Sequence, residues 1–264
     1  MDGLDVDQTL HASRTSQVIS KVPDATAAFW IAKLLSTAMG ESVSDALGHL
    51  IGHVPAVLVG ALAFVAALVV QLRCRRYSTW AYWTTVAMVG IFGTMAADVM
   101  HRIGLALPIS TALYAILLGG VFICWYWSEK TLSIHSIYTL RRELFYWSAV
   151  LATFALGTAA GDLTASTFRL GYLPSAILFI VVIAVPMVGY WKFGMNSVLA
   201  FWFAYVITRP VGASFADWMA APVGRSGLGW GTTWVGGVLA VAVLACIAFM
   251  ARTGRDKKPL RAGG

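Results

Sequence analysis

Long apolar stretches recur along nearly the whole chain and predict its secondary structure. Each is about as long as a helix that crosses a bilayer, which needs about 20 residues. They fall at 24–47, 55–72, 80–101, 107–127, 143–165, 173–191, 195–219 and 231–251. Helices satisfy their own backbone hydrogen bonds in lipid, so the pattern predicts an all-α membrane protein of about eight transmembrane helices.

The composition favours a membrane protein over a soluble one. Hydrophobic residues make up 59% of the 264 residues and charged residues only 12%, which is too little polar surface to coat a soluble globule of this size. The net charge of +7 is also typical of nucleic-acid-binding proteins, but here the basic residues flank the apolar stretches. We therefore expect the lipid bilayer, and no nucleic acid, as a partner.

The distribution of basic residues predicts the orientation in the membrane. If the N-terminus lies inside, the external side receives only Arg102, Arg169 and Arg225. The cytoplasmic side then receives Arg14, Lys21, Arg73, Arg75, Arg76, Lys130, Arg141, Arg142, Lys192, Arg252, Arg255, Lys257, Lys258 and Arg261. This bias predicts a protein of the bacterial inner membrane with both termini in the cytoplasm. We expect a disordered cytoplasmic tail at 1–22, a single membrane domain at 23–251 and a basic cytoplasmic tail at 252–264.

One motif occurs four times along the chain, at 29–45, 82–98, 146–162 and 201–217. Each copy reads aromatic-Trp-x9-Gly-x4-Asp. The conserved spacing joins Trp30, Trp83, Trp147 and Trp202 to Gly40, Gly93, Gly157 and Gly212, and these to Asp45, Asp98, Asp162 and Asp217. We interpret the chain as four two-helix repeats at about 23–75, 76–130, 140–192 and 194–251. Each repeat holds an even number of spans, so the four motif helices cross in the same direction and can surround a pseudo-symmetry axis along the membrane normal.

The segments FWIAKLLSTAMGESVSD (29–45) and FWFAYVITRPVGASFADW (201–218) carry a family resemblance. The chain resembles bacterial integral-membrane proteins that contain a tandem repeat of unknown function, and the resemblance extends from Lys21 to the last helix. Similar proteins are associated with metal-cation export, which is what the resemblance implies for this chain. Copy two departs from copy three, because Ala97 precedes its aspartate where copy three has Gly161.

Seven charged side chains fall inside the expected spans, beyond the first residue of each. The acidic ones are Glu41, Asp45, Asp98, Asp162 and Asp217, and the basic ones are Lys33 and Arg209. A charge inside a bilayer costs on the order of 3 kcal/mol unless it is paired, hydrated or neutralised. The set therefore predicts a polar cavity between the motif helices, in which protons or a bound cation balance the excess negative charge.

The residue types around the aspartates predict the kind of cation. Asp45 follows Glu41 by one helical turn, so both carboxyl groups share a helix face. Supporting ligands at the same level are Thr94, Met95, Thr158 and Ser214. Carboxylate-rich sites suit Mg²⁺, Ca²⁺ or Mn²⁺, and a methionine favours Mn²⁺ among them. We expect a transported divalent cation and no permanent cofactor.

Several of these residues have two interpretations. Lys33 and Arg209 lie nearer the cytoplasm than the aspartates of their own helices, so we expect a gating or charge-compensating layer; snorkelling to the headgroups is the alternative. The four tryptophans are expected to be interfacial anchors, and the four glycines to allow close helix packing. His49, His53 and His101 are either ordinary interfacial histidines or supporting metal ligands.

These patterns predict a secondary transporter that exports a divalent cation, Mn²⁺ first, in exchange for protons. A cation channel is the nearest alternative, because a ring of aspartates also makes a cation filter. An intramembrane aspartate-dependent enzyme fits less well, because four equivalent aspartates do not form a catalytic pair and no Ser-His or HExxH arrangement occurs. We do not expect an enzyme, and short loops disfavour a sensor or assembly factor. The pathway can lie in a monomer or a homodimer.

Overall fold

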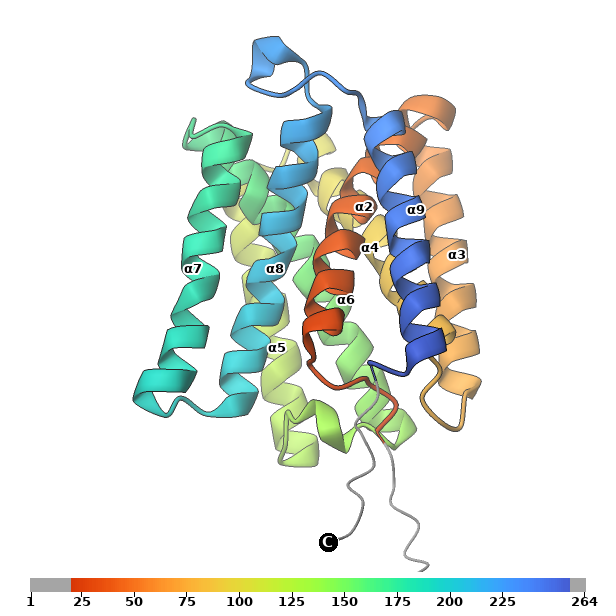
Figure 1. Ribbon diagram of the computed structural model, residues 1–264. Helices are drawn as coiled ribbons and strands as arrows, with labels where there is room; N and C mark the ends of the chain where they lie inside the picture. The colour runs from red at the N-terminus through yellow and green to blue at the C-terminus, as the bar shows by residue number, and fades with distance from the viewer. Residues whose placement is uncertain (1–19, 257–264) are drawn as a thin grey trace, which may run out of the picture.

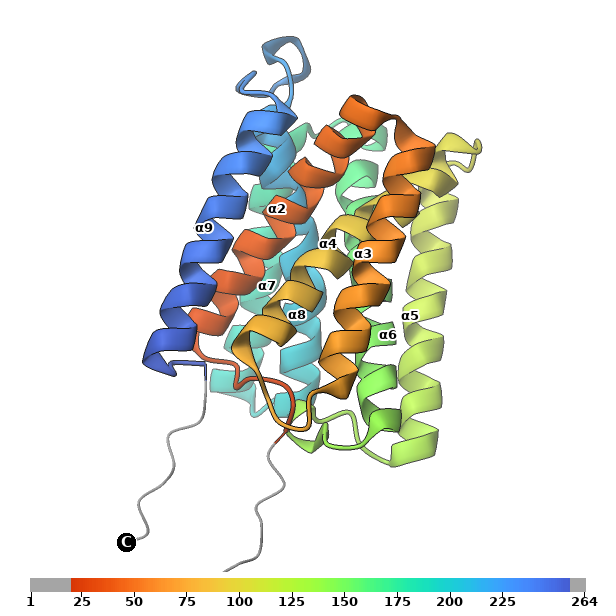
Figure 2. The ribbon, with the colours of Figure 1, turned by 90° about the vertical axis from the view of Figure 1, so that its right-hand side faces the viewer.

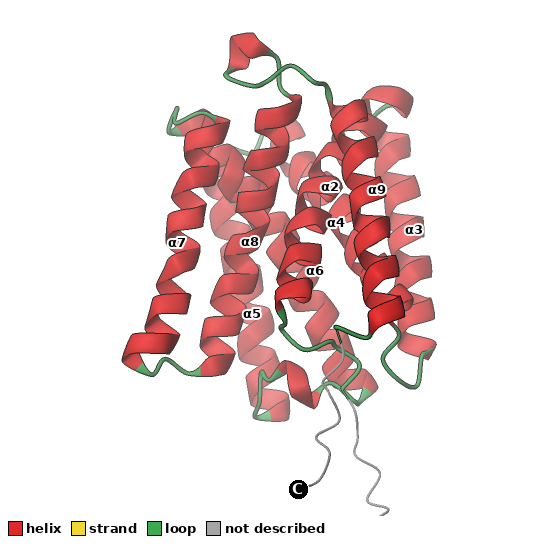
Figure 3. Ribbon diagram, in the orientation of Figure 1, coloured by secondary structure: helices red, strands yellow, loops and turns green. Residues whose placement is uncertain are grey.

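The computed structural model describes residues 20–256, and this part of the chain is helical without a strand (Figure 3). The long helices are α2 (Ala27–Ile51), α3 (His53–Arg73), α4 (Thr79–Arg102), α5 (Leu107–Glu129), α6 (Leu140–Asp162), α7 (Tyr172–Phe193), α8 (Ser197–Ala220) and α9 (Thr232–Thr253). Three short turns join them: η1 (Ile134–Ser136), η2 (Leu163–Thr167), which is a π-helix continuing α6, and η3 (Val223–Arg225). The predicted all-α fold with eight long helices is confirmed, and each predicted span overlaps one helix.

Seven of the eight long helices are long and apolar enough to cross a membrane. The remaining one is α2, which carries Lys33, Glu41 and Asp45. It runs alongside the others within the bundle (Figure 1), where α4, α8 and α9 cover its sides. Its charges are therefore compatible with a membrane protein because neighbouring helices, rather than lipid, surround them.

Local sequence signals explain where several helices begin and end. The hydroxyl of Thr26 accepts a hydrogen bond from the Phe29 amide and caps α2, and Thr139 caps α6 in the same way. Asn196 caps α8 by accepting from two amides of the first turn. Gly194 and Gly254, with φ of 64° and 65°, end α7 and α9 in the left-handed conformation that glycine adopts without steric cost.

The four motif helices, α2, α4, α6 and α8, form a closed inner ring. They contact one another in the order α2, α4, α6, α8 and back to α2. The outer helices α3, α5, α7 and α9 cover this ring, and each packs chiefly against the motif helix that follows it, with α9 packing on α2 (Figures 1 and 2). The ring is thus complete within one chain. The membrane-normal symmetry axis stays a prediction.

The motif glycines set the spacing of the inner ring. A Cβ atom added to Gly40 would lie 2.8 Å from the backbone carbon of Gly90, and one added to Gly93 would lie 2.7 Å from Cβ of Phe154. In the same way Gly157 faces the side chain of Arg209, and Gly212 faces Thr37. Each glycine therefore meets the residue three positions before the motif glycine of the next helix. The prediction of close helix packing is confirmed.

Both described ends of the chain lie at one end of the bundle, the termini end (Figure 1). Here Lys21 Nζ pairs with Glu143 Oε2 at 2.6 Å, and Gln71 donates to the other carboxylate oxygen at 3.0 Å. Residues 1–19 of the predicted disordered tail 1–22 lie outside the described part of the chain. Its last part is packed, because Lys21 and Val22 are buried and a buried carboxylate holds the lysine.

The other described end is tied to α4. Oδ2 of Asp256 accepts hydrogen bonds from Tyr77 at 2.5 Å and from Thr79 at 2.7 Å. Burial and then the hydrogen bond to Asp256 raise the pKa of Tyr77, so the phenol remains a donor at all ordinary pH values. Of the predicted basic tail 252–264, residues 252–256 are therefore ordered against the bundle, and residues 257–264 lie outside the described part.

The Lys21 contact gives a first testable prediction. Changing Lys21 to Ala leaves the buried Glu143 carboxylate with only Gln71 as donor, and we expect a loss of about 2 kcal/mol in the free energy of unfolding. Arg141→Ala is the matched control, because Arg141 pairs with Glu129 at 3.2 Å with a side chain that is 66% exposed and such pairs contribute little. Thermal unfolding in detergent measures both. Equal shifts for the two variants would contradict the anchoring role.

Candidate functional site

The four motif aspartates lie at the end of the bundle opposite the termini, which we call the aspartate end. Each sits in the last two turns of its motif helix, and Asp162 directly precedes the π-helix η2. All four are half-buried. Positions one residue earlier carry small buried side chains or none: Ser44, Ala97, Gly161 and Ala216.

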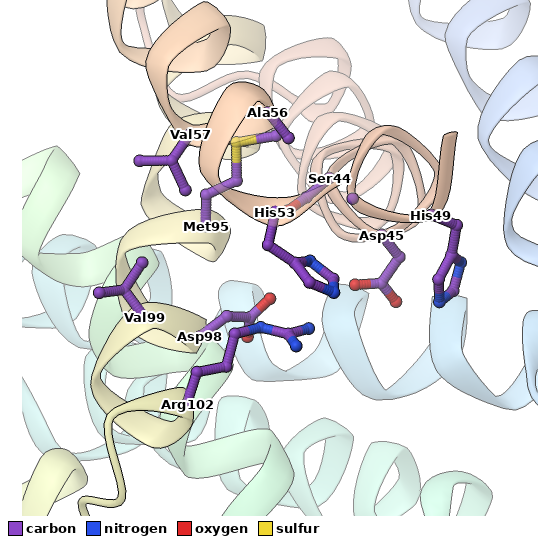
Figure 4. Close-up of a pocket in the computed structure, with 11 residues that line it drawn as sticks. Ser44, Asp45, His49, His53, Ala56, Val57, Met95, Asp98, Val99 and Arg102 are labelled. Atoms are coloured by element: carbon purple, nitrogen blue, oxygen red, sulfur yellow. The ribbon is translucent and has the colours of Figure 1, made fainter. Parts of the chain in front are cut away.

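A cavity of about 30 Å³ opens at the aspartate end between α2, α3 and α4, which is enough for one or two water molecules. Figure 4 shows the polar groups that point into it: the carboxyl groups of Asp45 and Asp98, the imidazoles of His49 and His53, and the guanidinium of Arg102. Met95 also lines it. Two predicted aspartates, the predicted methionine and two of the three histidines therefore share one space, together with a cation of the chain itself.

Below the aspartates, the axis of the inner ring holds a buried ion pair. Arg209 Nη2 lies 2.5 Å from Glu41 Oε2, and the side chains of the two residues are 0% and 5% exposed. Hydroxyl groups of Thr94 and Thr158 lie 3.4 Å and 3.3 Å from the same carboxylate oxygen. Together Glu41, Thr94, Thr158 and Arg209 form what we call the central cluster. It draws one side chain from each of the four motif helices.

The contacts of Arg209 fix its position in this cluster. Its Nη1 donates to the backbone oxygen of Thr37 at 2.7 Å, and its Nη2 donates to Thr158 Oγ1 at 2.7 Å and also to Thr94 Oγ1. A charge so far from water is tolerated because the carboxylate neutralises it and oxygen atoms accept its hydrogens. Pro210, inside α8, packs beside Gly157. Arg209 therefore blocks the axis of the ring, and it does not snorkel.

Lys33 lies deeper, toward the termini end, and it is also fully buried. Its Nζ sits 4.2 Å from the centre of the Phe154 ring and 4.3 Å from that of Tyr205. No hydrogen-bond partner for Nζ occurs among residues 20–256. The lysine and the arginine therefore occupy different environments, although the sequence predicted one charged layer, and only the arginine compensates a carboxylate in this conformation.

Aromatic side chains close the ring between Lys33 and the termini end. Those that are buried completely or almost completely include Phe29, Tyr82, Trp83, Tyr146, Trp147 and Trp202. The hydroxyl groups of Tyr82 and Tyr146 lie 2.5 Å apart. Three of the four motif tryptophans thus pack inside the protein, and the expectation of lipid-facing anchors is wrong for them. The physical reason is that their rings pack on aromatic residues of neighbouring helices: Trp83 on Phe29, Trp147 on Tyr82 and Trp202 on Trp125.

The structure separates the predicted ligands into two groups. Glu41, Thr94 and Thr158 bind Arg209, whereas Asp45, Asp98 and Met95 line the cavity. Asp162 and Asp217 neither bind Arg209 nor line the cavity. Ser214 is buried, and its hydroxyl group has no hydrogen-bond partner among the described residues. Within residues 20–256 no three His, Cys, Asp or Glu side chains lie close enough to hold a metal ion. The joint metal site of five carboxylates stays a prediction.

Two polar residues were not expected at these sites. Arg102 reaches into the aspartate-end cavity although it was assigned only to the external loop, and Glu143 is buried at the first turn of α6. Arg102 follows Asp98 by four residues, the spacing that places two side chains on one helix face. That spacing was the available signal for Arg102. The sequence held no comparable signal for Glu143, whose partners come from α3 and the segment before α2.

Comparison with known protein families agrees with the internal repeat. The family described as Repeat of Unknown Function (DUF347) matches four times, at residues 28–77, 81–131, 145–195 and 200–256. The chain belongs to this family. The four DUF347 copies coincide with the four motif-and-outer-helix pairs, and the apolar helices make the chain a membrane protein with an internal repeat. Neither a curated protein nor a solved structure matches the chain.

Proposed function

We propose that this DUF347 protein is a secondary transporter that exports a small divalent cation, with Mn²⁺ as the first candidate, in exchange for protons. In this proposal it lies in the bacterial inner membrane with the termini end in the cytoplasm and the aspartate end outside. The observation that carries the proposal is the Arg209–Glu41 ion pair, because it closes the axis of the ring next to the carboxyl groups of the aspartate end. Neither the metal nor the proton is a permanent cofactor.

The arrangement of charges supports cation binding at the aspartate end. Asp45 and Asp98 offer carboxylate oxygens in the cavity, and Met95 and the two histidines offer softer ligands that Mn²⁺ accepts. Arg102 points into the same space (Figure 4). A divalent cation that binds there would compete with this guanidinium for the carboxyl groups, so binding and release could be linked to a movement of one side chain.

The central cluster supports a transporter over a channel. A channel needs a continuous hydrated path, whereas here a fully buried arginine and a layer of buried aromatic rings fill the axis. Opening requires Glu41 and Arg209 to separate, and a separated Glu41 carboxylate would need a new cation. An arriving metal ion or proton can supply that charge. Alternating occupation of one carboxylate by arginine and by cargo is the basis of an exchange mechanism.

The ring of four motif helices is complete within one chain. This supports a pathway through a monomer, and a homodimer would then hold two separate pathways. The arrangement gives less support to an intramembrane enzyme, since the two cavity aspartates lie beside an arginine and two histidines rather than facing each other alone.

Manganese flux into proteoliposomes, with the internal pH recorded, tests the proposal. We expect saturable Mn²⁺ flux with opposite proton movement, reduced about tenfold or more in Asp98→Asn, because this variant loses a charged oxygen ligand of the cavity. An equal loss in Asp162→Asn would mean that Asp162, which lies outside the cavity, joins the site during transport. Mg²⁺ and Ca²⁺ serve as competitors. Asp24→Asn is the matched control, since Asp24 lies before α2 and pairs with His135 at 3.4 Å. Flux of no divalent ion by the intact protein would refute the transporter.

A further inference from the structure

The environment of Lys33 differs from that of every other buried cation in the described part of the chain. Lys21 has a carboxylate and Arg209 has a carboxylate, two hydroxyls and a carbonyl. Lys33 is 1% exposed, and its Nζ has only two aromatic rings beside it. An ammonium group without an acceptor is costly in a dry interior, and a ring face compensates only part of that cost.

The three repeats that lack this lysine show what the position otherwise holds. Seven residues before each motif glycine stand Lys33, Val86, Val150 and Tyr205, and all four are buried. Three copies therefore fill the axis at this level with groups that carry no charge. An amine in the first copy adds nothing to packing that a valine or methionine would not provide, so its basic nitrogen needs another explanation.

A lysine can gain and lose a proton, whereas an arginine keeps its charge under all ordinary conditions. We propose that Lys33 carries the coupled proton through the closed core, an inference that rests on the proposed function. A proton from the aspartate side binds the free amine of Lys33 and forms an ammonium group. When the termini end opens, water reaches Nζ and accepts that proton, and the amine returns to its uncharged form. The net result is one proton moved opposite to the metal ion.

The surroundings of Lys33 fit this role. On the side of the aspartate end lies Arg209, whose positive charge opposes an ammonium group at Lys33 while the ion pair is closed. Tyr205 lies at the level of Lys33, with its ring beside Nζ. Toward the termini end lie the hydroxyl groups of Tyr82 and Tyr146, 2.5 Å apart, which can relay a proton once water enters. The other titratable side chains on α3, α4, α8 and α9, the helices that pack against α2, lie elsewhere along them: His53, Arg73, Asp98, His101, Arg102, Asp217, Cys246 and Arg252.

Two transport modes separate the proton-carrying role from metal binding. In proteoliposomes, radioactive Mn²⁺ exchange between equal metal concentrations needs no net proton movement, whereas uphill Mn²⁺ movement driven by a pH gradient does. We expect Lys33→Met to keep exchange within about twofold of the wild type and to lose gradient-driven uphill movement. Lys33→Arg should lose both modes, because the guanidinium group cannot release its proton and so stays charged. Lys192→Met, which removes an exposed lysine from α7, should keep both.

A second measurement is independent of transport. Methionine has nearly the same length as lysine and no group that needs an acceptor, so the Tm of Lys33→Met in detergent should equal or exceed that of the wild type. A marked fall in Tm would show that the amine has an acceptor in the folded protein and would overturn the proposal. Uphill movement that persists in Lys33→Met, or exchange lost together with it, would also overturn it. Absent Mn²⁺ flux in the wild type would instead reject the transporter itself and the carrier role with it.

Discussion

Replacing Arg209 with methionine is expected to cost about 3–5 kcal/mol of unfolding free energy and to abolish Mn²⁺ transport. The variant leaves the Glu41 carboxylate buried with only the hydroxyl groups of Thr94 and Thr158 nearby. Breaking a buried ion pair by removing one partner leaves an uncompensated charge, which is the costly case. Thermal or denaturant unfolding in detergent measures the first effect and proteoliposome flux the second.

The double variant Glu41→Leu/Arg209→Met is the informative control. It removes both charges, so we expect it to recover most of the lost stability, because an apolar pair of similar volume avoids the desolvation cost. Transport should remain absent, since the proposed exchange needs the carboxylate. A coupling energy near zero in the double-mutant cycle would mean that the two side chains do not act as a pair. Recovered transport in the double variant would remove the central cluster from the mechanism.

The sequence was sufficient to predict the fold because the physical constraint on membrane helices is strong. Apolar length located all eight helices, and the repeated glycines located the close helix contacts. Apolar length is a property of a single helix, and the repeated glycines stand at equivalent positions of the four repeats, so both can be read without the three-dimensional arrangement. The burial of Trp83 and Trp147 could not be predicted in this way, because an aromatic residue near a helix start fits either an interface or a core.

The sequence did not predict that Glu41 is the partner of Arg209. The sequence places Arg209 nearer the cytoplasm than Asp217 on its own helix, so it points to no partner there. In the repeat register, however, Arg209 stands three residues before its motif glycine and Glu41 one residue after its own. That difference of four residues is about 6 Å along parallel helices, which an arginine side chain can span. The order of the helices in the ring, which brings α8 next to α2, was the missing information.

For the four aspartates, the sequence predicts their level along the helices but not the distances between them. Sequence placed them correctly at one level and one end, but four residues at equal height on four helices need not approach one another. Asp45 and Asp98 share a cavity because α2 and α4 are neighbours and α3 covers them. Asp162 and Asp217 lie outside that cavity, so a metal site that uses all four requires a rearrangement at the aspartate end. Glycine contacts in the middle of the ring provide the point about which such movement could occur.

The contact between Gly40 and Gly90 is expected to be the most sensitive point of the ring. A methyl group at Gly40 would meet the backbone carbon of Gly90 at 2.8 Å and its Cα at 3.0 Å. Backbone atoms inside a helix cannot move aside as a flexible side chain does, so α2 and α4 must separate. We expect Gly40→Ala to lower the free energy of unfolding by about 3 kcal/mol, at the upper end for overpacked interiors. Because Glu41 follows Gly40 directly, the variant should also weaken the central ion pair and reduce transport.

Gly119→Ala in α5 is the matched control for this prediction. A methyl group there meets no atom within 4 Å, and alanine costs no more than glycine within a helix. We expect unchanged unfolding and unchanged flux for this variant, each measured beside Gly40→Ala in the same detergent and the same lipid. If Gly40→Ala were as stable as Gly119→Ala, then α2 and α4 would have room to separate at no cost. The ring would then not be held at its glycine level, and the closed position of Arg209 would depend on its ion pair alone.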